Sequence, residues 1–149
     1  MTIEIHSELI KALKIAFATE YSFYLKAHFF HWNVEGENFP QYHELFGTIY
    51  QEVFDKIDDF AENIRKLSSY TPGSFTRLSM LAKIQDEIEV IPAKSMLQDL
   101  LQDSDACVNV FKMVYNLAER EGEHGLSNFL AERMDAHRKH SWQLRATLK

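Results

Sequence analysis

The sequence predicts an all-α fold, a four-helix bundle in which one long connection crosses the bundle. The 149 residues include only five glycines and three prolines, so breaks are few and the elements between them are long. Apolar residues recur every three or four positions in four long stretches, the spacing of helices with one buried face. The connection between the second and third stretches is about 20 residues long, enough to cross the whole bundle.

Composition indicates one globular domain spanning residues 1–149. The chain is 46% hydrophobic and 13% aromatic, which is sufficient for a buried core. Cys107 is the single cysteine, so no intrachain disulfide can form. No segment approaches the roughly 18 apolar residues of a membrane span, and the N-terminus lacks a signal-peptide pattern. We expect a cytoplasmic protein with no membrane partner, and a formal charge of −6 argues against general affinity for nucleic acid.

The first two predicted helices span residues 7 to 32 and about 39 to 67. Ser7 is the expected N-cap of the first helix, and Asn38 is a candidate N-cap of the second. Residues 33 to 38 form a turn so short that the two helices should pack antiparallel.

A crossover with its own short helix follows. Residues 68 to 74 break the second helix, residues 75 to 85 predict a short helix, and residues 87 to 92 look extended. The third helix spans about 92 to 120 and the fourth 126 to 148, and the long crossover sets helices two and three parallel. The expected buried residues of the fourth helix are Phe129, Leu130, Met134, Trp142 and Leu144.

Four residues between positions 31 and 62 have the chemistry of metal ligands: His31, His43, Asp58 and Glu62. With His43 at zero on a helical wheel, Asp58 falls near 60° and Glu62 near 100°, at about 100° per residue. The apolar residues of the same helix fall between about 200° and 300°. They are Leu45, Ile49, Val53, Phe60, Ile64 and Leu67. The polar stripe therefore faces away from the core of its own chain.

Distance divides these residues into two half-sites. Along a helix, Asp58 lies about 22 Å and Glu62 about 28 Å from His43, whereas metal–ligand bonds span about 2 to 2.5 Å. His31, at the end of the first helix, belongs with His43. A two-fold axis pairing second helices antiparallel would bring the histidines of one copy to the carboxylates of another, twice per dimer. A mixed imidazole–carboxylate set with open positions suits Fe(II).

The same residues also have interpretations without a metal. Asp58 and Glu62, at i and i+4, can belong to a solvated acidic face in which Glu62 pairs with Lys66 or Arg65. His31 can be a helix-end histidine satisfied by hydrogen bonds.

Two other histidine clusters carry weaker signals. Glu121 and His124 have the Glu-x-x-His spacing of di-iron bundles, but glycines interrupt it and no second copy occurs, so an intrachain di-iron centre is not expected. His137 and His140, at i and i+3, could bind a metal weakly, although a polar surface or an interface fits them better.

The segment HWNVEGENFPQYHELF followed by DDFAENIRKL resembles the signature of the Dps family, the mini-ferritins. DAHRKHSWQLRATL is similar to the C-terminal region of that family, so the resemblance covers nearly the whole chain. It implies a ferritin-like bundle that assembles into a hollow twelve-subunit shell. It also implies ferroxidase sites at two-fold interfaces, where Fe(II) is oxidised, often by hydrogen peroxide, and stored as a ferric mineral.

Matched position by position, His31 and His43 correspond to iron ligands from one subunit, and Asp58 and Glu62 to ligands from its partner. Glu62 matches the bridging carboxylate, and Trp32 matches an aromatic beside the site. The resemblance thus implies iron, Fe²⁺ and Fe³⁺, as the bound metal and these four ligands as the catalytic residues.

The chain departs from the family at two places. Many members have an aspartate where this chain has Gly47, so the second iron loses a ligand, for which Gln51, Glu44 or water could substitute. Glycine also weakens a helix by about 1 kcal/mol, which suggests a role for Gly47 in close approach of the neighbouring chain. Residues 1 to 10 contain no Lys or Arg, whereas DNA-binding members often use a basic tail, so we expect no DNA binding through the tails.

The sequence therefore predicts a ferroxidase and iron-storage cage that oxidises Fe(II) with hydrogen peroxide or oxygen and protects against oxidative damage, with activity impaired by Gly47. The alternative is a Dps-like shell that protects DNA and has weakened or lost ferroxidase activity. A third possibility is a bundle whose function is protein interaction alone.

Overall fold

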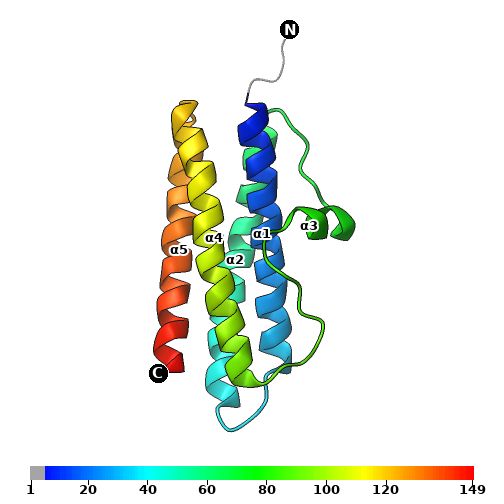
Figure 1. The fold of residues 1–149 in the computed structure, drawn as a ribbon, viewed down its shortest axis with the longest axis vertical. Helices are drawn as coiled ribbons and strands as arrows, with labels where there is room; N and C mark the ends of the chain where they lie inside the picture. The colour runs from blue at the N-terminus through cyan, green and yellow to red at the C-terminus, as the bar shows by residue number, and fades with distance from the viewer. Residues whose placement is uncertain (1–5) are drawn as a thin grey trace.

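The structure, a computed structural model, describes residues 6–149 as an all-helical fold. Five helices follow one another: α1 (Ser7–Asn33), α2 (Phe39–Lys66), α3 (Phe75–Leu81), α4 (Ala93–Arg120) and α5 (His124–Leu148). Figure 1 shows α1, α2, α4 and α5 side by side as a bundle, with the short α3 outside it. The predicted four-helix bundle with a short extra helix in the crossover is confirmed. The expectation for the N-terminal tail falls partly on residues 1–5, which lie outside the described residues.

The crossover sets α2 and α4 parallel, as the sequence predicts. α2 returns antiparallel to α1 after the short turn (Figure 1). The chain then passes back along the outside of α1 before α4 begins at the end of the bundle where α2 also begins. Among residues 6–149, no helix has both the length and the apolar character that a membrane span requires.

The core is apolar and draws on all five helices. Its largest fully buried apolar side chains are Leu9, Leu13, Phe23, Phe30, Phe46, Ile49, Phe60, Ile64, Met96, Leu97 and Phe111. On α2, Ile49, Val53, Phe60 and Ile64 are completely buried, which confirms the predicted inner face of this helix. The opposite face of α2 is consequently free to carry polar groups.

The helix termini differ from the prediction in three respects: α3 is shorter, α5 begins at His124 and not at residue 126, and the cap of α1 is a different residue. α3 stops at Leu81 because Ala82 is extended and the Lys83 backbone N–H donates to the Thr19 hydroxyl of α1 at 3.0 Å. α1 begins at Ser7, and its N-cap is His6 with φ of 65°, so the predicted capping role of Ser7 is wrong. The His6 side chain contacts Glu121, which ties the start of α1 to the turn before α5.

On α5 the predicted burial is correct for Leu130 and Leu144, but wrong for Trp142, which is 57% exposed. Trp142 lies about 160° around the helix from Leu144 at 100° per residue, so it falls outside the buried stripe. Phe129 and Met134 are half-buried and pack against the core.

Candidate metal centre

His31 and His43 lie together where α1 ends and α2 begins. The Nδ1–H of each ring donates to the backbone carbonyl oxygen of the other residue, at 2.7 Å in both cases. The rings stack with centroids 3.8 Å apart and planes inclined by 17°. A proton fixed on Nδ1 leaves the Nε2 lone pair available, which is how metal-ligating histidines are commonly oriented. The pair is therefore a preformed set of two nitrogen donors.

Gly47 makes room for this pair within its own chain. A Cβ at position 47 would lie 3.0 Å from Cε1 and 3.1 Å from Nδ1 of His31. Such contacts are closer than most Cβ atoms tolerate, so a side chain here would push the His31 ring from its place. The structure thus gives Gly47 a role within its own chain, which is to leave space for the His31 ring. The close approach of a neighbouring chain at Gly47 stays a prediction. Of the predicted substitute ligands, Gln51 donates to Asp55 at 2.9 Å and Glu44 is exposed.

Aromatic rings enclose the histidines on one side. His28 lies between Tyr50, stacked at 3.9 Å, and Trp32 at 3.8 Å, and its Nδ1 is 3.2 Å from the Tyr24 hydroxyl. Burial lowers the pKa of His28, and the neighbouring His31 lowers it further. The lowered pKa favours the neutral form of His28, which adds no positive charge beside the pair.

Asp58 and Glu62 lie exposed on the outer face of α2. Within the described part of the chain neither carboxylate forms an ion pair, and the predicted alternative partner Arg65 instead stacks over the Tyr70 ring at 4.8 Å. α2 is continuous from Phe39 to Lys66, so its rise separates Asp58 from His43 by about 22 Å. One chain consequently presents a histidine half-site and a carboxylate half-site that do not meet.

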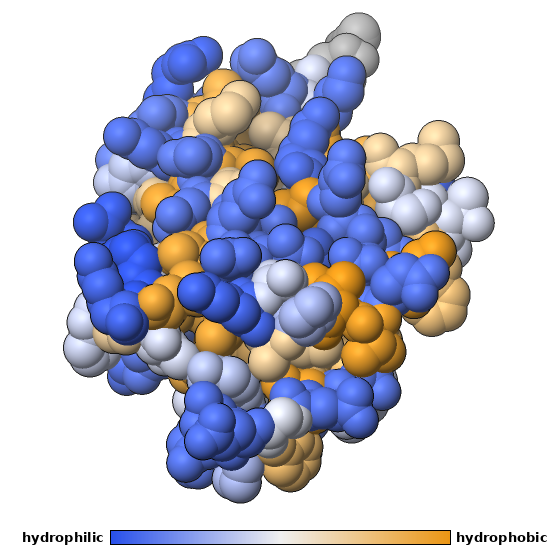
Figure 2. All heavy atoms as spheres, turned by 60° about the horizontal axis from the view of Figure 1, so that its bottom comes forward, coloured by the Kyte–Doolittle hydropathy of each residue, from blue (hydrophilic) through white to orange (hydrophobic). Residues whose placement is uncertain are grey.

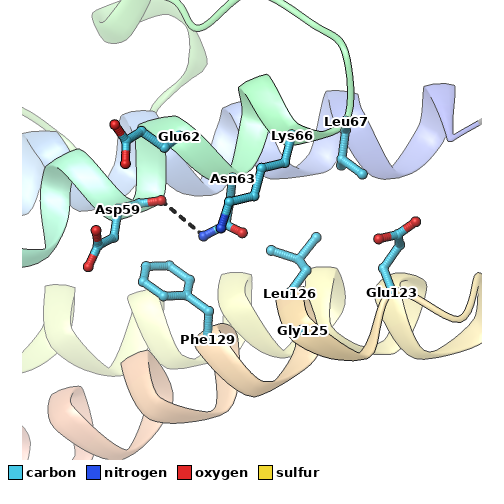
Figure 3. Close-up of a pocket in the computed structure, with 9 residues that line it drawn as sticks. All are labelled: Asp59, Glu62, Asn63, Lys66, Leu67, Glu123, Gly125, Leu126 and Phe129. Atoms are coloured by element: carbon cyan, nitrogen blue, oxygen red, sulfur yellow. Dashed lines mark hydrogen bonds between the residues drawn. The ribbon is translucent and has the colours of Figure 1, made fainter.

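Glu62 lies at the edge of a groove between the second half of α2 and the start of α5, with its carboxylate directed outward (Figure 3). Figure 3 shows Asp59, Glu62 and Lys66 on one side of the groove and Glu123 and Phe129 on the other, with the Asn63 amide donating to the Asp59 carbonyl oxygen. The groove encloses about 440 Å³. The carboxylate half-site is thus open to solvent and accessible to a hydrated cation.

A second polar cluster, which the sequence did not predict, is buried in the middle of the bundle. Glu20 of α1 and Glu52 of α2 face Arg133, His137 and His140 of α5. Glu20 and His137 are completely buried, and Arg133 and His140 are only 2% and 3% exposed. The prediction that His137 and His140 lie on a polar surface or interface is therefore wrong. An i,i+3 spacing is equally compatible with a surface position and with a buried one. Only the partner residues on other helices show that these histidines are buried.

The buried cluster is internally compensated. Burial alone would raise the pKa of Glu20, but the charges and hydrogen bonds of His137 and Arg133 hold it below its ordinary value. The pKa of Glu52 is likewise lowered, by its hydrogen bonds to His140 and Arg133 against the effect of burial. Burial lowers the pKa of His140, which favours its neutral form. Oxygen, sulfur and nitrogen atoms of Glu20, Cys107 and His137 lie within 4.8 Å of one another, so the cluster also has donors of metal-ligand type.

Comparison with known proteins places this geometry in context. The Ferritin family model, described as a ferritin-like domain, matches residues 10–149. The chain is 29% identical over 126 residues to the DNA protection during starvation protein of Helicobacter pylori J99, covering 84% of this chain and 88% of that protein.

Two solved structures share both fold and sequence features. The Dps protein of Vibrio cholerae O1, described as a member of a broad superfamily of ferritin-like diiron-carboxylate proteins, matches with a TM-score of 0.91 and 29% identity over 96% of this chain and 90% of that one. A Dps protein from Bacillus brevis matches with a TM-score of 0.94 and 26% identity over the whole of both chains.

Proposed function

Because the chain belongs to the ferritin-like family and, within it, to the Dps mini-ferritins, we propose that it stores iron and protects against oxidative stress by oxidising Fe(II) at sites shared between two copies. Iron is here the substrate and the stored product. The observation that carries the proposal is the His31–His43 pair: each ring is held through Nδ1, and neither Nε2 hydrogen-bonds to a carboxylate among residues 6–149.

The second copy supplies what the histidine half-site lacks. Two α2 helices related by a two-fold axis would bring Asp58 and Glu62 of one copy against His31 and His43 of the other. Two imidazoles and two carboxylates with an open position form a donor set suited to Fe(II), and the carboxylate charge favours Fe(III) once the electron has left.

Exposed apolar side chains support a homo-oligomer. Figure 2 shows hydrophobic surface between the hydrophilic side chains on the face seen there. On α1 and α2, Trp32 is 58% and Phe54 49% exposed, on the side of the histidine pair, and on the crossover Phe75 is 79% and Ile88 81% exposed. Large apolar side chains exposed in a single chain are often covered in an assembly, and we propose that copies of this chain cover these in a twelve-subunit shell.

The oxidation balances with hydrogen peroxide as the oxidant. Two Fe(II) each give one electron, and one peroxide takes both electrons with two protons to give two waters and two Fe(III). Gly47 supplies no carboxylate at the position next to His31, so one iron is held by four protein ligands and the second by fewer. We therefore expect activity below that of a site with a fifth ligand. Oxygen would serve as a slower oxidant.

The test is stopped-flow absorbance of ferric product after anaerobic Fe(II) loading and addition of peroxide or oxygen. Replacement of both carboxylates, Asp58→Ala with Glu62→Ala, should lower the initial rate at least tenfold, because iron would lose two of its four ligands.

The matched control is Asp55→Ala with Asp59→Ala, which removes the same charge at the same i,i+4 spacing from the same helix. This control should retain most of the rate. Equal rates for the wild type and the Asp58/Glu62 variant would contradict the site assignment. Equal losses of rate in both double variants would show that the loss comes from removing negative charge from α2 and not from removing iron ligands.

DNA protection is the competing function, since the Helicobacter pylori relative is named for it. The formal charge of −6 per chain opposes binding to a phosphate backbone. A gel-shift titration at low and at physiological salt distinguishes the two functions: we expect no shift at physiological salt, and a retained shift there would favour the DNA-coating function.

A further inference from the structure

The buried cluster has the donors of a metal site, but a protein cation occupies its centre. Glu20 of α1 and Glu52 of α2 both pair with Arg133, and each also pairs with one histidine of α5, Glu20 with His137 and Glu52 with His140. Two carboxylates and two imidazoles on three helices form the same donor set as the outer half-sites. Here all four come from one chain, and the guanidinium of Arg133 lies between them.

Arg133 makes the contacts that a divalent cation would otherwise make. Its Nε and Nη2 donate to Oε2 of Glu20 at 3.0 and 2.9 Å. Its Nη1 and Nη2 donate to Oε2 and Oε1 of Glu52 at 2.5 and 3.1 Å. One fork thus binds two carboxylates that would otherwise repel each other in a medium of low dielectric constant.

The histidines are aimed at the same carboxylates. Nε2 of His137 lies 2.6 Å from Oε1 of Glu20, and Nε2 of His140 lies 2.8 Å from Oε1 of Glu52. Nδ1 of His137 is held by the Ser104 hydroxyl at 3.0 Å, whereas Nδ1 of His140 is buried without a hydrogen-bond partner in the described chain. Among the described residues, the hydrogen bond to Glu52 is therefore the only one that the His140 ring makes.

We propose that Arg133 is a built-in cation that closes an intrachain site for a first-row divalent metal, and that removing its side chain opens the site. The ligands of the opened site are Glu20 and His137, whose donor atoms already lie within 4.8 Å of each other and of the Cys107 sulfur, together with the neighbouring Glu52 and His140. This set suits Fe²⁺, Co²⁺ or Zn²⁺. While Arg133 is present, the interior carboxylates are neutralised and iron is left to the outer half-sites. The inference does not depend on the proposed ferroxidase function, since it concerns other residues.

The test is titration of metal-free Arg133→Ala with Co²⁺, followed by visible absorption and by thermal unfolding. Both proteins that are compared, with and without Arg133, also carry Asp58→Ala and Glu62→Ala, so that the outer carboxylates do not bind Co²⁺ in either. Arg133→Ala should bind one additional Co²⁺ per chain, with ligand-field bands of protein coordination, and its melting temperature should rise with Co²⁺. The Arg133-containing chain should show neither effect.

Three controls separate metal binding from loss of charge. Arg133→Met loses the same charge but fills the space, so it should gain no Co²⁺ site, and Arg138→Ala removes an exposed arginine from the same helix and should also gain none. Adding Glu20→Gln to Arg133→Ala should abolish the new site. If Arg133→Ala is unfolded without metal, refolding in Co²⁺ should restore its helical circular dichroism.

The proposal is overturned if folded Arg133→Ala binds no more Co²⁺ than Arg133→Met, or if Co²⁺ fails to restore an unfolded variant. It is also overturned if the chain that retains Arg133 already shows the bands and loses them on Glu20→Gln, because the site would then not be closed.

Discussion

The outer half-sites and the buried cluster both consist of carboxylates and imidazoles, but only the buried carboxylates are paired within the chain. In the bundle interior, Glu20 and Glu52 meet Arg133, His137 and His140 within one chain. On the outer face of α2, the carboxylates of Asp58 and Glu62 find no such partners among residues 6–149.

The difference between the two sets lies in compensation. A buried carboxylate must be paired, because an isolated charge in the interior costs several kcal/mol, whereas an exposed one is solvated by water. The interior set is therefore complete and closed. The exterior set stays available for a cation and for a second copy, which makes it the better candidate for chemistry.

The largest expected effect comes from breaking the interior set. Glu20→Gln removes one charge from a fully buried position and leaves Arg133 and His137 partly uncompensated. We expect a loss of about 3–5 kcal/mol in the free energy of unfolding. Urea unfolding followed by circular dichroism measures it, and a loss below 1 kcal/mol would show that the cluster contributes little to stability.

The next effect is a loss of stability in acid. The pKa values of Glu20 and Glu52 are lowered in the fold, so their contribution is complete above the unfolded value of about 4.5 and is lost as the pH falls below it. The pKa of His140 is lowered from 6.5 by burial, so protonation of the unfolded chain also removes stability as the pH falls below 6.5. Urea midpoints should begin to fall below about pH 7 and should continue to fall below about pH 4.5.

His140→Gln can still donate to Glu52 but does not titrate. In this variant the fall above about pH 5 should be smaller, while the fall below it persists. If the urea midpoints of His140→Gln depend on pH as those of the wild type do, His140 is not the cause of the fall above about pH 5.

Substitutions at Gly47 test the outer half-sites and should change the free energy of unfolding less than Glu20→Gln does. Gly47→Ala gains helix propensity but meets the His31 ring, so stability should change by less than about 1 kcal/mol, while Fe(II) oxidation slows as His31 moves. Gly47→Asp has the same Cβ contact and adds a carboxylate, so it should bind more Fe(II) per chain than Gly47→Ala in anaerobic calorimetry. Equal binding by the two variants would show that the missing ligand is not at position 47.

The smallest effect belongs to the outer carboxylates themselves. Without metal, Asp58 and Glu62 repel each other at i,i+4, so Glu62→Gln should stabilise the protein by about 0.2–0.5 kcal/mol. Thermal unfolding in the presence of a chelator measures this change in stability. Glu20→Gln is the comparison, because it removes the same charge from a buried position and should destabilise the protein. A destabilisation above 1 kcal/mol would mean that Glu62 has a partner after all.

The fold and the outer histidine pair could be read from the sequence because both depend on local spacing. The apolar period of α2 predicts the burial of Ile49, Val53, Phe60 and Ile64, and with it the outward face of Asp58 and Glu62. The short turn after α1 predicts that His31 and His43 meet, and they do. The metal role of these residues stays a prediction.

The buried cluster was not predictable in the same way, although it left a trace. Glu20 falls within the apolar stripe of α1, between Phe17 and Phe23, and Arg133 and His137 fall in the stripe of α5 that also contains Leu130. Charged residues of opposite sign in two buried stripes suggest mutual pairing. Which of them pair is decided by contacts across more than a hundred residues, for which the spacing within one helix gives no information.

The most direct test of the shared metal centre is complementation between two inactive chains. One chain carries His31→Ala and His43→Ala, and the other carries Asp58→Ala and Glu62→Ala, and the two are unfolded and refolded together. A two-fold contact between the two variants contains one complete site and one empty site, so random pairing should restore roughly a quarter of the wild-type sites. We predict that Fe(II) oxidation with peroxide, absent in each variant alone, returns in the mixed oligomer. No recovery in a mixed oligomer of normal size would contradict a centre shared between copies.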